Sequence, residues 1–441
     1  MTRAADEVGS HPLGERLAAA FAVAVTLPGL WLRISGTHLS DPLDALLYGF
    51  AIVGAAFILS WAAEVAQLDI SAGLAIAVLA FIAVLPEYAV DMVFAWKGGN
   101  AVELYGRACR AAGDGGESAC SLALANMTGA NRLLIGIGWS LVVFLIWYRS
   151  RRAGHRVTEV VLDRPHAVEI GYLALATVYS LLLPLKHSIT PFDAVVLVGI
   201  FVAYTIRVSR APAEEPHLVG PALLIGRLAP GPRRAMTVGM FLFAAAVILL
   251  TAEHFAESLV LTGRQFGVSE FLLVQWLAPL ASEAPELLIA GLYAWRLNHE
   301  AALGTLVSSK VNQWTLLVGT LPIVFALALG DLHGLPIDAH QREELFLTAA
   351  QSLFAIGVLL SLSISTREAL ALFGLFWAQF LVGALVPDAL SGVERVAVGG
   401  VYVLLAALIL VRERRSIRPL VRDGFRRSYT ELALVERPAA D

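Results

Sequence analysis

The sequence predicts an all-α membrane protein that crosses the bilayer about 11–12 times. Of its 441 residues, 58% are hydrophobic and only 15% are charged, whereas a soluble domain is about half apolar and about a quarter charged. Apolar runs of about 20 residues, the length that a bilayer-spanning helix needs, recur along the whole chain. The net charge of −4 gives no basic excess for nucleic-acid binding, and two cysteines are too few for a zinc cluster.

The first apolar run, residues 17–35, is short and contains Pro28 and Gly29, so it could also be the core of a signal peptide. No small-x-small cleavage site follows it, and we therefore expect a helix. The expected spans are 17–35, 43–65, 70–96, 118–147, 165–185, 190–208, 234–260, 267–296, 300–329, 345–363, 368–387 and 393–411.

Arginines gather in alternate connections between these spans. Loops 148–165 and 207–234 are rich in arginine, and so is the tail after residue 411. The positive-inside rule places all three in the cytoplasm, which also puts both termini there and indicates an inner or plasma membrane. The tail arginines either retain the tail on that side or bind lipid or regulate the protein. They are Arg412, Arg414, Arg415, Arg418, Arg422, Arg426 and Arg427.

Both cysteines lie near one outer loop. Cys109 is in loop 97–117, and Cys120 is at the start of the next span. The topology places this loop outside the cell, where disulfides persist. We expect a Cys109–Cys120 disulfide, the alternative being two unpaired thiols.

An internal repeat dominates the sequence. A Pro-Glu pair inside an apolar run occurs at Glu87 and again at Glu286, 199 residues later, and a tryptophan follows each glutamate after nine residues. The next helices align with an offset of 179, so the first copy has 20 extra loop residues. On the expected topology, helix 70–96 runs outward and helix 267–296 runs inward. Inverted repeats are typical of secondary transporters, which bind their cargo near the midplane.

Each repeated helix carries two acids on one face. Glu87 and Asp91 are four residues apart, and Glu283 and Glu286 are three apart. A charge at the bilayer centre costs about 2.5–3.5 kcal/mol, which favours a functional role over acids that merely pack as ion pairs or in protonated form. The adjacent proline also frees backbone carbonyls. Carboxylates and carbonyls together are the hard oxygen ligands that Na⁺ and Ca²⁺ prefer.

The helix that follows each Pro-Glu helix is polar and rich in small residues. Small residues allow close helix packing, whereas Asn126, Asn131 and Gln313 could supply neutral oxygens. Lys310, one of only three lysines in the chain, lies in the second of these helices.

These segments resemble the α-repeats of the cation/calcium exchanger superfamily. The motifs are Leu85-Pro86-Glu87 with Ala125-Asn126-x-x-Gly129-Ala130-Asn131, and Ala284-Pro285-Glu286 with Gly304-Thr305-x-x-Ser308-Ser309. The resemblance implies a ten-helix core of two inverted five-helix repeats and alternating access. It also implies exchange of Ca²⁺, or another cation, for Na⁺ or H⁺.

The resemblance implies that Glu87 and Glu286 are the main cation ligands. Candidate auxiliary ligands are Glu283, Asp91, Asn126, Asn131, Ser282, Ser309 and Gln313. The expected organisation is an N-terminal segment with an extra helix (1–42), a first repeat half (43–208), a cytoplasmic linker (209–233), a second repeat half (234–388), and an extra helix with an arginine-rich tail (389–441).

The sequence departs from the family pattern at several sodium ligands. The usual Gly-Thr-Ser before Leu-Pro-Glu is Ile82-Ala83-Val84 in the first copy, and a family asparagine is Lys310 in the second. The Lys310 ammonium either stands where a monovalent cation binds in other members or neutralises Glu283 or Glu286. We therefore expect fewer ions per transport cycle, with protons as possible counter-ions.

We interpret the chain as a secondary-active cation antiporter and not an enzyme. It lacks the H-E-x-x-H, G-x-S-x-G and Walker motifs of proteases, hydrolases and ATP-driven pumps. The alternatives are an uncoupled cation channel, a sodium/proton exchanger on the same fold and, more remotely, an enzyme acting on lipid headgroups. We expect no cofactor and no nucleic-acid partner, only transported cations and membrane lipids, and the sequence leaves the oligomeric state open.

Overall fold

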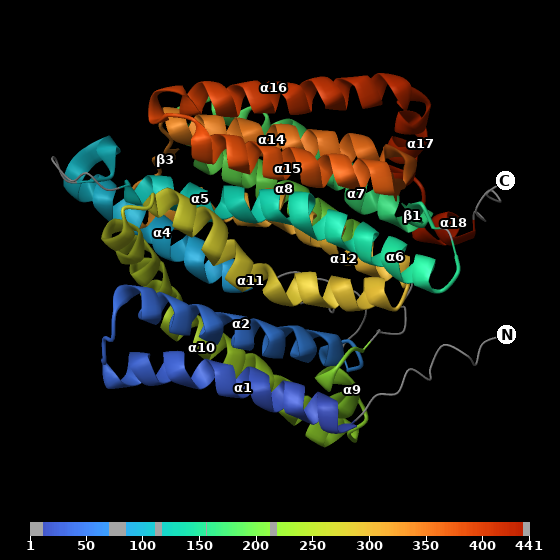
Figure 1. The fold of residues 1–441 in the computed structure, drawn as a ribbon, viewed down its shortest axis with the longest axis horizontal. Helices are drawn as coiled ribbons and strands as arrows, with labels where there is room; N and C mark the ends of the chain where they lie inside the picture. Colours follow the sequence, from blue (N-terminus) through green and yellow to red (C-terminus); the bar gives the residue numbers. More distant parts are fainter. Residues whose placement is uncertain (1–11, 70–84, 111–116, 156, 212–217, 435–441) are drawn as a thin grey trace. The chain divides into compact units, whose positions relative to one another are not determined.

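The computed structural model describes residues 12–69, 85–110, 117–155, 157–211 and 218–434, and most of them are helical (Figure 1). Nine helices in this described part are long and apolar enough to cross a membrane, each at an expected span. The spans expected at 267–296 and 368–387 are also helices, α11 (Glu270–Trp295) and α15 (Thr366–Leu385). The span expected at 70–96 lies partly outside the described residues, and its remainder begins α4 (Leu85–Tyr105). The all-α polytopic fold is thus confirmed.

The chain divides into two compact units that cut across the repeat halves expected from the sequence. The first unit comprises Met1–Val90 and Ala213–Val268, and the second comprises Asp91–Pro212 and Ser269–Asp441. Each unit therefore combines segments of both repeats, and the division falls within α4.

The first unit is built from α1 (Pro12–Ser35), α2 (Asp41–Ala66), α9 (Pro221–Gly226) and α10 (Pro230–Phe266). The expected helix at 17–35 is confirmed as α1, which packs against α2. The two helices approach closely because Gly29 has no side chain: a Cβ there would lie 2.7 Å from the Ala51 Cβ. Arg233 at the start of α10 clamps Asp69, just after α2, with two hydrogen bonds of 2.8 Å.

The second unit contains the larger helix bundle. Its helices are most of α4, α5 (Ala119–Leu133), α6 (Ser140–Arg152), α7 (Ala167–Ser180), α8 (Pro191–Val208), α11, α12 (His299–Asn312), α13 (Val318–Leu329), α14 (Ala339–Val358), α15, α16 (Asp388–Arg412), α17 (Arg414–Phe425) and α18 (Tyr429–Leu434). Short π-helical segments, η2 (Leu134–Trp139) and η5 (Gln313–Leu317), join α5 to α6 and α12 to α13. These segments begin 179 residues apart, which is the repeat offset.

Two short antiparallel ladders each pair a strand of one repeat with a strand of the other. Strand β1 (Glu159–Val161) precedes α7 and pairs with β4 (Ser363–Ser365), which precedes α15. Strand β2 (Ser188–Ile189) precedes α8 and pairs with β3 (Leu335–Pro336), which precedes α14. Helices α7 and α14 are the fourth helices of the two copies, and α8 and α15 are the fifth. The strand before the fourth helix of each copy therefore pairs with the strand before the fifth helix of the other. The pairing is therefore the same when the copies are interchanged, as internal two-fold symmetry requires.

The direction of the helices confirms that the copies are inverted. Strand β1 follows α6 and contacts both α6 and α12. Just after β1, the His166 ring nitrogen Nε2 lies 3.6 Å from Glu300 on the first turn of α12. The α5–α6 helix thus ends where its repeat counterpart α12 begins, so the two run in opposite directions.

The expected disulfide is confirmed. Cys109 and Cys120 are bonded, with their Cα atoms 5.9 Å apart, and the bond links the turn that follows α4 to the first turn of α5.

Candidate cation-binding site

Helix α11 presents two buried carboxylates on one face. Glu283 and Glu286 lie one turn apart in the middle of the helix, and oxygens of the two side chains lie within 4.8 Å of each other. Two negative charges this close in a low-dielectric interior repel strongly unless a cation or a proton is shared between them. The pair can therefore hold a cation or take up protons.

Neutral oxygens on α12 and the π segment η5 accompany this pair. Gln313, the first residue of η5, donates its amide Nε2 to Glu283 Oε1. The Gln313 Oε1 is buried and has no hydrogen-bond partner in the described part of the chain. Ser309 lies one turn earlier and is also buried, and its hydroxyl has no hydrogen-bond partner among the described residues. Buried oxygens of this kind are suited to coordinate a hard cation.

The first repeat contributes a second polar pair. Asn126 on α5 donates its Nδ2 to Asp91 Oδ1 on α4 over 2.9 Å, and both residues are buried. Within the described residues, the Asn126 Oδ1 accepts no hydrogen bond. One turn further along α5, Gly129 faces the backbone of Gln275 on α11. A Cβ at Gly129 would lie 2.7 Å from the Gln275 carbonyl carbon, so only glycine allows α5 and α11 to approach this closely.

Lys310 meets its own repeat counterpart. Its ammonium donates to the side-chain oxygen of Asn131 over 2.6 Å and also to the Asn131 backbone carbonyl. Asn131 and Lys310 are 179 residues apart, so equivalent positions of the two repeats touch each other. The ammonium also lies 5.4 Å from the centre of the Trp314 ring, a cation–π contact. The Lys310 side chain therefore joins α12 to α5 at equivalent positions of the two repeats.

Glu87 and Ser282 complete the set of expected ligands. Glu87 lies on the first described turn of α4, in the first unit, one helical turn before Asp91. The Ser282 hydroxyl is buried and lies 3.3 Å from the carbonyl oxygens of Ala278 and Pro279 in its own helix.

A buried network that the sequence did not reveal surrounds Arg132. The guanidinium lies 3.0 Å from Glu344 on α14, bonds to Gln379 on α15 and stacks on Trp276. Gln275 on α11 donates to the same Glu344 oxygen over 3.0 Å. Arg132 is thus neutralised away from the glutamate pair of α11. The only sequence signal for Glu344 was its acidic side chain next to the expected span 345–363.

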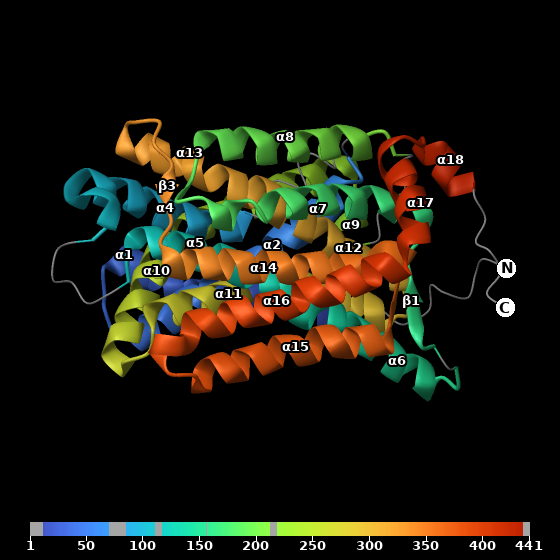
Figure 2. The same cartoon turned by 90° about the horizontal axis from the view of Figure 1, so that it is seen from above.

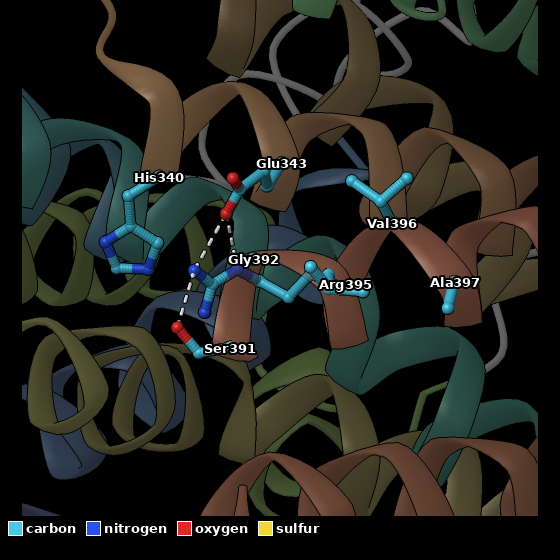
Figure 3. Close-up of a pocket in the computed structure, with 8 residues that line it drawn as sticks. His340, Glu343, Ser391, Gly392, Arg395, Val396 and Ala397 are labelled. Carbon is cyan, nitrogen blue, oxygen red and sulfur yellow. Dashed lines mark hydrogen bonds and ion pairs between the residues drawn. The ribbon is translucent and has the colours of Figure 1, made fainter. Parts of the chain in front are cut away.

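A hollow in the described part of the structure lies elsewhere, at the first turns of α14 and α16. Figure 3 shows the Arg395 guanidinium held by Glu343, with Ser391 and His340 beside it. The Arg395 Nη2 lies 2.8 Å from Glu343 Oε2. Because this carboxylate is already paired with an arginine, the hollow lacks the surplus negative charge that a cation would require.

The chain matches proteins of known type. The family model described as sodium/calcium exchanger protein matches residues 45–210 and 236–385. The solved structure of a protein titled H⁺/Ca²⁺ exchanger CAX is 42% identical to this chain, with a TM-score of 0.82, and the match covers 93% of this chain and 98% of the other. The structure of native YfkE is 14% identical with a TM-score of 0.55, covers 88% of this chain and all of its own, and shares the fold. No curated protein matches the sequence.

Proposed function

The chain belongs to the sodium/calcium exchanger family, and from that premise we propose that it moves Ca²⁺ across its membrane in exchange for protons by alternating access. It is a multi-pass membrane protein of a family of cation exchangers. The observation that carries the proposal is the buried Glu283–Glu286 pair on a membrane-length helix, accompanied by neutral oxygens.

The proposed ligand set fits a divalent cation. Ca²⁺ takes roughly 6–8 oxygen ligands in flexible geometry. We assign the main carboxylates to Glu87 and Glu286, and an additional carboxylate to Glu283. Asn126, Ser309 and Gln313 would add neutral oxygens, and Asp91 would hold Asn126 in place. The cations would bind transiently as cargo, with no resident cofactor.

Protons are favoured over sodium as the counter-ion. Hydroxyl ligands that sodium-coupled members carry before the first Pro-Glu are absent from this sequence. The solved relative with 42% identity is titled an H⁺/Ca²⁺ exchanger. Carboxylates as close as those of Glu283 and Glu286 are also expected to take up protons when the cation leaves, because repulsion between them is then unscreened.

Charge counting supports this exchange. Arg132 is neutralised by Glu344, so the proposed site holds the carboxylates of Glu87, Asp91, Glu283 and Glu286 and the ammonium of Lys310, a formal charge of −3. One Ca²⁺ or two protons change this charge equally. We propose that Lys310 is a permanent cation that replaces one transported monovalent ion.

The proposed location is an inner or plasma membrane with both termini in the cytoplasm. The arginine-rich loops 148–165 and 207–234 and the tail support this orientation by the positive-inside rule.

Uptake of ⁴⁵Ca²⁺ into proteoliposomes tests the proposal. With an acidic interior, we expect Ca²⁺ to accumulate against its gradient. A sodium-loaded interior at equal pH should give no accumulation, and neither should vesicles without any gradient. Accumulation driven by sodium would contradict proton coupling. Rapid equilibration without a counter-ion would indicate a channel.

A matched pair of variants on α11 identifies the helix face that matters. Glu286→Gln should abolish uptake because it removes a proposed ligand without changing side-chain size. Glu270→Gln, on the first turn of the same helix, should keep uptake because Glu270 accepts a backbone hydrogen bond from Glu117 and is not a proposed ligand. Equal activity of both variants would remove the basis of the ligand assignment.

A further inference from the structure

Helix α17 is strongly amphipathic. Arg414, Arg418 and Arg422 recur every four residues, and Arg415 lies beside this stripe on the same face. Leu420 and Gly424 lie on the opposite face and are buried against the bundle. The helix therefore turns a basic face outward and a small apolar face inward.

The position of α17 is that of a helix at the membrane boundary. The membrane-length helix α16 ends at Arg412, and a single residue, Glu413, separates it from α17. Figure 2 shows α17 turning away from α16 at the end of the bundle, beside α18. The arginine stripe thus begins where the apolar span stops, which is the depth of the lipid headgroups.

Specific contacts hold α17 against α7. The buried Asp423 carboxylate lies 3.0 Å from Arg164, just before α7. Gly424 has no room for a side chain, since a Cβ would lie 2.7 Å from the Ala167 carbonyl oxygen. The Phe425 and Tyr172 rings lie 5.0 Å apart. The direction in which the basic face points is therefore fixed by the fold.

The outward charges are not neutralised by the protein. Segment 412–427 contains seven arginines and two carboxylates, Glu413 and Asp423. Both carboxylates already have arginine partners. Within the described residues, Arg414, Arg415 and Arg418 have no acidic partner, and all three are exposed.

One exposed apolar side chain, Val421, borders the stripe. Its side chain is 49% exposed. Interfacial helices combine such residues, which enter the acyl boundary, with arginines at headgroup depth. Guanidinium groups also bind phosphate oxygens in a bidentate manner, which a single ammonium cannot do.

We propose that α17 is an interfacial helix whose arginine stripe binds the phosphate groups of anionic phospholipids. The partner is the headgroup layer of the surrounding bilayer, because α17 follows a membrane-length helix after a single residue and the exposed Val421 borders the charges. Bound headgroups would also influence cation transport through the helices that α17 contacts. Helix α17 packs on α7, and His166 at the start of α7 lies against Gly304 on α12, the helix that carries Lys310.

Native mass spectrometry of the full-length protein in detergent tests the proposal directly. The protein is titrated with phosphatidylglycerol and, separately, with phosphatidylcholine of the same chain length. We expect phosphatidylglycerol to bind more tightly, and the triple variant R414Q/R415Q/R418Q to lose this preference. Each arginine near an anionic membrane surface raises the binding affinity about fivefold, so three substitutions should weaken phosphatidylglycerol binding on the order of 100-fold.

The control removes the same number of charges from another helix end. R149Q/R151Q/R152Q affects arginines at the end of α6, whose guanidinium groups lie over Trp295, Trp147 and Tyr148. This variant should keep the phosphatidylglycerol preference. The charge-preserving variant R414K/R415K/R418K should retain part of it, and remains informative if the glutamine variant fails to fold.

Three results would overturn the proposal. The first is an unchanged lipid preference in the α17 glutamine variant, measured on folded protein. The second is an equal loss of preference in the α6 control. The third is displacement of phosphatidylglycerol by an equal concentration of inorganic phosphate, which would mean that the arginines bind free anions and not the bilayer surface.

Discussion

Breaking the buried Arg132–Glu344 pair should destabilise the second unit strongly. The charged groups lie 3.0 Å apart, and the two side chains are only 2% and 6% exposed. Removing one partner of such a pair leaves an uncompensated buried charge, which costs about 3–5 kcal/mol. Glu344 would still have Gln275 at 3.0 Å and Arg395 at 3.8 Å after Arg132→Met. We therefore expect the lower end, about 3 kcal/mol.

Thermal unfolding of purified protein, followed by tryptophan fluorescence, measures this cost. The second unit spans 295 residues. At about 2.1 cal/mol/K of unfolding entropy per residue, about 3 kcal/mol corresponds to a Tm lowered by roughly 5 °C. Glu344→Gln should fall in the same range because it leaves the Arg132 charge buried. The double variant R132M/E344Q should lose clearly less than the sum of the two, since both charges are then gone.

The matched control is Glu413→Gln, at an ion pair whose Arg412 side chain is 85% exposed. Exposed pairs contribute about 0–1 kcal/mol, so its Tm should hardly change. A Tm of Glu344→Gln equal to that of Glu413→Gln would refute the cost of the buried charge. So would a Tm loss in R132M/E344Q equal to the sum of the losses in the two single variants.

Three further outcomes are expected. Gly129→Ala should prevent folding or greatly lower the yield of folded protein in size-exclusion chromatography, because its Cβ would collide with the α11 backbone. Gly199→Ala should be tolerated, because no other atom lies within 4 Å of a Cβ at that position. Equal yields of the two variants would contradict this. Lys310→Asn should change the Ca²⁺-to-counter-ion ratio or introduce sodium dependence in flux measurements, and an unchanged ratio without sodium dependence would rule out its role as a built-in cation. Hydrogen bonds from Arg233 lower the pKa of Asp69 below its usual value of 3.8, and desolvation opposes this shift only in part. The Asp69 carboxylate therefore stabilises the fold above pH 3.8, and this contribution is lost as the pH falls through the lowered pKa. The Tm difference between wild type and Asp69→Asn should therefore be constant from pH 8 to about 5 and shrink below about pH 4, and a difference that grows in acid would refute it.

Local and repeated features of the sequence predicted much of the fold. Apolar run length located the helices, and the Pro-Glu repeat predicted the inverted copies. The disulfide was expected because Cys109 and Cys120 both lie near one outer loop. These features depend on residues that are near in sequence or related by a fixed offset.

Features that depend on tertiary contacts could not be predicted in this way. The partner of Arg132 could not be predicted because nothing in its own helix reveals Glu344, 212 residues later. The contact between Lys310 and Asn131 likewise arises only when the repeats pack together. The ladder strands are two or three residues long, too short for a periodicity signal.

Calcium binding to the purified protein tests the central claim most directly. Equilibrium binding of ⁴⁵Ca²⁺ should be saturable in the wild type. Glu87→Gln and Glu286→Gln should each weaken binding by more than the 10–100-fold that is lost when a residue hydrogen-bonded to a metal ligand is removed. Glu343→Gln, in the hollow of Figure 3, should bind like the wild type. Unchanged binding in Glu87→Gln and Glu286→Gln would show that the cation is held elsewhere and would contradict the account.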